Sequence, residues 1–165
     1  MLAKNTIANL FKHSDRFDSM DATITRTMAR YGIPMLRIGL GIVFVWFGAL
    51  KLVPGLSPAE GLVRRTVYFV NPDWFIPVLA VWEVVIGAAL LLHWRPRVTL
   101  LLMFPQLIGT SMPLFLLTDV VWKDFPFVLT LEGQYILKNL VLLPAAVVLG
   151  GTVRGARLDY ERIEK

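Results

Sequence analysis

Glu83 is the residue in this sequence whose position most strongly indicates chemistry. It lies in the middle of IPVLAVWEVVIGAALLLH, an apolar run from Ile76 to His93 that is long enough to cross a bilayer. A helix that begins near Trp74 carries Glu83 to a depth of roughly 13 Å, close to the middle of the hydrocarbon layer. A carboxylate at that depth is costly unless a partner stabilises it, so Glu83 marks either a functional site or an internal ion pair.

Two lysines are the candidate partners of Glu83, and both approach it from the same predicted membrane edge. Lys138 lies about four residues into the last predicted span, at roughly 6 Å depth, where its side chain cannot easily reach water. Lys51 ends the first predicted span at the same edge. We therefore predict a Glu83–Lys138 ion pair, with Lys51 as the second candidate. Arg37 lies at the opposite edge and is a poorer partner.

These charges allow two interpretations. In the first, the ion pair only fixes the register of the helices. In the second, the charged groups line a polar cavity that binds a small molecule such as a quinone head group. The predicted walls of such a cavity are Gln106, Trp46, Trp82 and Tyr135.

The composition places the chain among integral membrane proteins. Hydrophobic residues make up 56% of the 165 residues, mean hydropathy is +0.61, and the apolar residues are gathered into blocks. The absence of cysteine excludes disulfides, thiol catalysis and cysteine-ligated metals. No metal-ligating constellation, phosphate loop or nucleophile–base pair is visible, and no basic block indicates a nucleic-acid partner.

The apolar blocks predict an all-α fold, a bundle of four transmembrane helices that forms one domain over 34–151. The predicted spans are 34–53, 74–93, 98–117 and 134–151. Two prolines, Pro105 and Pro113, predict a kink in the third span. In the first span, one helical stripe combines two cations with small residues that allow close helix approach; it consists of Arg37, Gly41, Phe44, Gly48 and Lys51.

The segments outside the spans carry further helix signals. Residues 1–33 show a helical period with a basic face, which predicts an amphipathic helix in the cytoplasmic interface of the membrane. Ser57-Pro58-Ala59-Glu60 is a capping-box sequence that predicts a short surface helix, about 58–70, on the outer side. Residues 152–165 are a charged tail. Eleven lysines and arginines fall on the side of the termini and three in the opposite loops, which predicts cytoplasmic termini.

Three segments together resemble the DoxX-like membrane proteins, specifically their YkgB-type branch. LRIGLGIVFVWFGALKLVP in the first span resembles the family segment that opens with Arg and closes with G-x-x-K-x-x-P. WEVVIG resembles the E-x-x-x-G element, here Glu83 and Gly87, and EGQYILKNL resembles the last-span element that contains Lys138. The resemblance covers about Ile33 to Gly151. It implies a four-helix bundle in the bacterial inner membrane, with Gly87 as a packing residue.

The resemblance leaves two classes of function open. Relatives include a quinone-linked thiosulfate oxidoreductase subunit, subunits associated with oxidant defence, and assembly chaperones. The first expectation is a quinone-associated redox subunit, itself an enzyme or a non-catalytic part of one, whose polar site combines Glu83, Lys138, Lys51, Arg37 and Gln106. The second is a non-catalytic scaffold or chaperone, and a small transporter is a third. The expected partners are the lipid bilayer, a membrane or redox protein, and a second copy of the chain.

Overall fold

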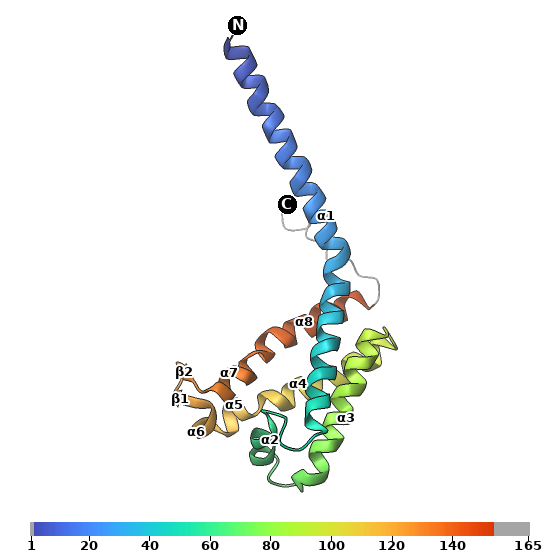
Figure 1. Cartoon of the computed structure of the whole chain (residues 1–165), viewed down its shortest axis with the longest axis vertical. Helices are drawn as coiled ribbons and strands as arrows, with labels where there is room; N and C mark the ends of the chain where they lie inside the picture. Colours follow the sequence, from blue (N-terminus) through green and yellow to red (C-terminus); the bar gives the residue numbers. More distant parts are fainter. Residues whose placement is uncertain (1, 154–165) are drawn as a thin grey trace. The chain divides into compact units, whose positions relative to one another are not determined.

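The protein is mostly helical (Figure 1). The computed structural model describes residues 2–153, with side chains from Ser19 onward, and the chain divides into two compact units, Met1–Leu36 and Arg37–Lys165. The helices are α1 (Leu2–Lys51), α2 (Glu60–Thr66), α3 (Pro72–Leu91), α4 (Pro96–Ser111), α5 (Pro113–Leu116), α6 (Thr118–Val121), α7 (Leu131–Leu137) and α8 (Asn139–Thr152). An antiparallel hairpin of β1 (Trp122–Asp124) and β2 (Val128–Leu129) lies between the third and fourth predicted spans.

Four helical stretches within the described residues are long and apolar enough to cross a membrane, which confirms the prediction of a multi-pass membrane protein. They are Ser19–Lys51, Pro72–Leu91, Pro96–Leu116 and Leu131–Thr152. The predicted tail, 152–165, lies outside the described residues beyond Val153.

The helix that contains the first predicted span does not begin at Pro34, because α1 runs through this proline. A proline inside a helix removes one backbone hydrogen bond but leaves the helix on both sides intact when the flanking residues favour it. In the first unit, Thr23 and Thr27 add hydrogen bonds from their hydroxyls to the carbonyls four residues earlier. An apolar face of this unit is exposed; it carries Met20, Ile24, Met28 and Tyr31.

Two of the spans are interrupted where their polar residues lie. In the third span, α4 continues through Pro105 and ends before Pro113, so only the second predicted kink site breaks the helix. In the fourth span, α7 ends at Leu137 and α8 begins at Asn139, with Lys138 at the junction. Thr130 caps α7 by accepting a hydrogen bond from the Gly133 amide, so the helix begins at Leu131, three residues before the predicted span.

Three glycines allow α3 to lie directly against the second-unit part of α1. A Cβ placed on Gly41 would lie 3.1 Å from the Gly87 carbonyl oxygen, and one on Gly48 would lie 2.9 Å from the Ala80 carbonyl oxygen. A Cβ on Gly87 would approach the Val45 amide nitrogen to 2.6 Å. These distances leave no room for a side chain, so the small residues fix the spacing of the two helices.

The short helix α2 begins later than its sequence signal predicted. Ser57 accepts a hydrogen bond from the Ala59 amide, and the helix starts at Glu60, whose carboxylate accepts from the Gly55 amide. The predicted capping box therefore forms a turn that precedes the helix. Leu62 of α2 is buried against Val121 and Ile136, which fixes α2 next to the ends of α5, α6 and α7.

Gly87→Ala should lower the thermal unfolding temperature in detergent, because the added methyl group meets the backbone of α1 rather than a flexible side chain. The expected loss is about 1–3 kcal/mol of unfolding free energy. Gly39→Ala is the matched control, since a Cβ there meets nothing within 4 Å. Equal unfolding temperatures for the two variants would contradict the close α1–α3 contact.

Candidate functional site

Glu83 forms an ion pair with Lys51, which corrects the prediction that Lys138 is its partner. The Lys51 Nζ–Glu83 Oε2 distance is 2.5 Å, and the two residues are 7% and 5% exposed. Lys51 is the last residue of α1 and lies one turn beyond Gly48, on the stripe that contacts α3. The close approach of α1 and α3 therefore brings Lys51 to Glu83, whereas Lys138, at the junction of α7 and α8, contacts the rings of Phe47 and Tyr135.

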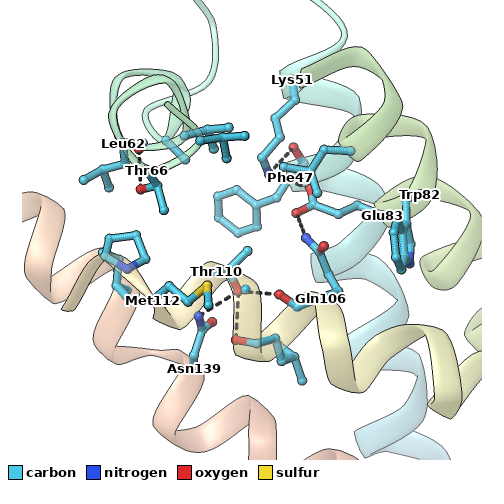
Figure 2. A pocket seen from close by; sticks show the side chains of 18 of the residues that line it. Phe47, Lys51, Leu62, Thr66, Trp82, Glu83, Gln106, Thr110, Met112 and Asn139 are labelled. Atoms are coloured by element: carbon cyan, nitrogen blue, oxygen red, sulfur yellow. Dashed lines mark hydrogen bonds and ion pairs between the residues drawn. The ribbon is translucent and has the colours of Figure 1, made fainter. Parts of the chain in front are cut away.

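Gln106 of α4 completes the coordination of the carboxylate. Its Nε2 donates to Glu83 Oε1 at 2.5 Å, so each oxygen of Glu83 accepts a hydrogen bond from a different helix (Figure 2). Lys51 also donates to the Phe47 carbonyl at 3.4 Å. Three membrane spans are thus linked through one buried carboxylate, as a buried charge requires.

Lys138 has an aromatic environment in place of the predicted carboxylate. Its ammonium lies 3.6 Å from the ring centroids of both Phe47 and Tyr135, and these two rings meet edge to face at 5.4 Å. No carboxylate in the described part of the chain forms an ion pair with it. Electron-rich ring faces attract a desolvated cation, so the two rings hold Lys138 at the junction of α7 and α8.

Asn139 joins α8 to α4 and was not singled out from the sequence. Its Nδ2 donates to the hydroxyls of Thr110 and Ser111, and the Thr110 hydroxyl in turn donates to the backbone carbonyl of Gln106. Thr110 and Asn139 are both labelled in Figure 2. The signal was available, because Asn139 is a carboxamide in an apolar span next to the one lysine of that span.

Arg37 does not belong to this cluster, contrary to the prediction. Its Nη1 donates to the Leu90 carbonyl at 2.9 Å, near the C-terminal end of α3. The His93 amide also donates to this carbonyl, and a cation is favourable at the C-terminal end of a helix. Arg37 therefore caps α3 and lies several turns along α1 from the Lys51–Glu83 pair.

A cavity of about 490 Å³ lies beside the cluster, within the second unit. Its lining is mostly apolar and includes residues of α1, α2, α3, α4, α5, α7 and α8; the charged residues and those with a hydroxyl or carboxamide that line it are Lys51, Thr66, Tyr68, Glu83, Gln106, Thr110, Tyr135, Lys138 and Asn139. Trp82 and Tyr135 lie in its wall as predicted from the sequence, whereas Trp46 does not line it and is 65% exposed.

Part of the cavity lining is exposed. Val78 and Trp82 of α3, and Pro105 and Gly109 of α4, line the cavity and are exposed, and so are lining residues of other segments: Tyr68, Phe69, Trp74, Met112 and Leu116. The four residues of α3 and α4 belong to two helical stretches that are long and apolar enough to cross a membrane.

Helix α2 covers the cavity at the end where Lys51 lies, and Arg64 attaches it to α3. The Arg64 guanidinium donates to Glu60 at 3.1 Å and to Asp73 at 2.9 Å. The Gly55 amide and Arg64 hold the pKa of Glu60 below its usual value of 4.5, and Asp73 and Glu60 raise the pKa of Arg64. Leu62, which lines the cavity, lies on the same short helix.

The four candidate spans among the described residues define a multi-pass membrane protein, with a largely apolar cavity beside a buried charge cluster. Comparisons with protein-family models, curated proteins and solved structures find no match for this chain. The function must therefore be argued from the geometry of the cavity.

Glu83→Gln should lower the unfolding free energy by about 3–5 kcal/mol, because it leaves the Lys51 ammonium buried without a counter-charge. Adding Lys51→Met should recover most of the loss, since the double variant buries no charge at this position. Thermal unfolding in detergent measures both effects. Adding Lys138→Met to Glu83→Gln serves as the matched comparison; recovery of stability by Lys138→Met, and not by Lys51→Met, would contradict the observed pairing.

Arg64→Gln should speed hydrogen exchange of the α2 amides a few-fold, because it removes both ion pairs of the helix. Arg65→Gln is the control, since Arg65 is an exposed neighbour with no ion pair among the described residues. Identical exchange in the two variants would show that Arg64 does not hold α2.

The same contacts predict a pH dependence. A folded-state pKa of Glu60 below 4.5 means that the stabilising effect of Glu60 is complete above pH 4.5 and is lost as the pH falls through the lowered value. Protection of the α2 amides in the wild-type protein, corrected for intrinsic exchange, should fall over that range.

Proposed function

We propose that this protein is a membrane-embedded binding subunit for a lipid-soluble molecule with a polar ring head group, of which quinones are the representative class. The cavity beside Glu83 is the observation that carries the proposal. Its volume of about 490 Å³ falls within the range of about 300–1,000 Å³ that is typical of small-molecule sites. Its combination of an apolar lining with a few polar groups suits an amphiphile whose head group lies at the polar end.

Each part of the cavity has a role in this proposal. Phe47 and Tyr135 hold Lys138 in the wall beside the head group, and the apolar lining that α3 and α4 contribute accommodates a tail that extends into lipid. Glu83 is engaged by Lys51 and Gln106, so its role is to position Gln106 rather than to contact the ligand directly. The site binds and orients, and a redox partner would carry out the electron transfer.

The proposal also assigns the chain a place in the cell. The spans form a bundle in a bacterial inner membrane, with the N- and C-termini cytoplasmic, as the distribution of lysine and arginine favours. The exposed apolar face at Met20, Ile24, Met28 and Tyr31 suits a helix in the membrane interface. The resemblance to the DoxX-like proteins supports the same class, a quinone-linked redox or oxidant-defence subunit.

A scaffold or assembly chaperone is the second candidate, and one observation favours it. Within the described residues, every fully enclosed side-chain nitrogen or oxygen has a hydrogen-bond partner, and both Glu83 oxygens are satisfied by Lys51 and Gln106, so the carboxylate needs no ligand. In that case the cluster only fixes helix register. A protein of this kind would co-purify with one membrane partner and would be indifferent to quinone.

Filling part of the cavity distinguishes the two candidates. Gly109→Leu places a side chain where a Cβ meets nothing within 4 Å, and it should stabilise α4 slightly because leucine favours a helix more than glycine. Decylubiquinone bound to the purified protein in lipid nanodiscs, measured by extraction and chromatography, should fall about tenfold or more. Gly39→Leu, at a helix position outside the cavity with equally open space, should leave it unchanged. Equal binding by both variants, or none by the wild type, would overturn the proposal.

A further inference from the structure

The Gln106 carboxamide uses its NH₂ group in a hydrogen bond, whereas its side-chain carbonyl oxygen, Oε1, has no donor among the described residues. Its Nε2 donates to Glu83 Oε1, and no donor in the described part of the chain contacts its Oε1. A carboxylate oxygen can only accept, so the amide must turn its NH₂ group toward Glu83. The Glu83 ion pair therefore fixes the direction in which the Gln106 carbonyl points.

The free carbonyl oxygen must reach the cavity. Side-chain oxygens that are fully enclosed all have a partner within the described residues, so an Oε1 without one is not fully enclosed. Gln106 is only 5% exposed overall, and it lines the cavity. The cavity thus presents a hydrogen-bond acceptor at its polar end, in surroundings where an unmet acceptor is costly.

Lys138 provides the complementary group. Its ammonium contacts two ring faces and no carboxylate among the described residues, so its N–H groups are available to an oxygen in the cavity. A ligand that satisfies both residues must donate to Gln106 and accept from Lys138. A quinone carries only acceptor oxygens, whereas a phenol or hydroquinone carries a hydroxyl that donates and an oxygen that accepts.

We propose that the cavity selects a head group with a ring hydroxyl, of the phenol or hydroquinone class, over one that carries only acceptors, and that the Gln106 carbonyl is the specificity-determining group. This inference rests on the proposed function, because it concerns the same cavity. It assigns the lysine a different role: Lys138 contributes to affinity for any oxygen-bearing head group and does not distinguish a hydroxyl from an ether.

A redox-inert probe pair tests the selection directly. 4-Nonylphenol and its methyl ether, 4-nonylanisole, share the ring and the tail and differ in the hydroxyl proton. Wild-type protein in nanodiscs should bind the phenol about tenfold or more tightly than the ether after correction for partitioning of each probe into empty nanodiscs, because only the phenol satisfies Gln106. Equal affinities, or a preference for the ether, would overturn the inference.

Variants then identify the residue that accepts the hydrogen bond from the ligand hydroxyl. In Gln106→Met the preference for the phenol should disappear, while Lys138→Met should weaken both probes and keep the preference. Tyr135→Phe should also keep it. Loss of the preference in Tyr135→Phe, with Gln106→Met unaffected, would overturn the assignment to Gln106. If Gln106→Met fails to fold, the wild-type comparison and the two other variants still decide.

The outcome for this inference is separable from the outcome for the proposed function. Binding of decylubiquinone that Gly109→Leu abolishes, together with equal affinities for the two nonyl probes, would leave the cavity as a quinone-class site and reject hydroxyl selection. Absence of decylubiquinone binding together with a clear phenol preference would reject quinones and retain a ring-hydroxyl ligand.

Discussion

A carboxylate in the middle of an apolar span requires donors from other spans, and this requirement governs the arrangement of the helices. Glu83 obtains a cation from the end of α1 and an amide from α4, so both helices must lie against α3 at the same depth. The first contact is possible only because Gly41, Gly48 and Gly87 remove the side chains that would separate α1 from α3. The electrostatic and the steric constraints thus reinforce each other.

The contacts of the polar side chains in the fourth span follow from this arrangement of α1, α3 and α4. Asn139 bonds to Thr110 one turn from Gln106, which ties α8 to α4 without a further charge. Lys138 is then left without a carboxylate and is held by Phe47 and Tyr135 instead. These side chains line the cavity, and among them the Gln106 side-chain oxygen and the Lys138 ammonium have no hydrogen-bond or ion-pair partner in the described part of the chain.

The sequence predicted the spans and the importance of Glu83, but it assigned the wrong lysine to it. Depth along a helix can be counted from residue numbers, and it placed Lys51 and Lys138 at the same membrane edge. Which helix lies next to α3 depends on packing. The glycine stripe that ends at Lys51 indicates that α1 packs closely on α3, and it therefore predicts the partner of Glu83 better than depth does. The interruptions at Lys138 and Met112, the β-hairpin and the cavity depend on tertiary contacts that no local pattern contains.

The decisive measurement is an experimental density map of the protein in lipid nanodiscs with a saturating alkyl hydroquinone under reducing conditions. We expect a flat ring in the cavity, with a hydroxyl within hydrogen-bond distance of Gln106 Oε1 and Glu83 still paired with Lys51. A cavity closed by side chains, or occupied only by lipid acyl chains, beside an intact Lys51–Glu83–Gln106 cluster would contradict the claim and leave the cluster a purely structural link between helices.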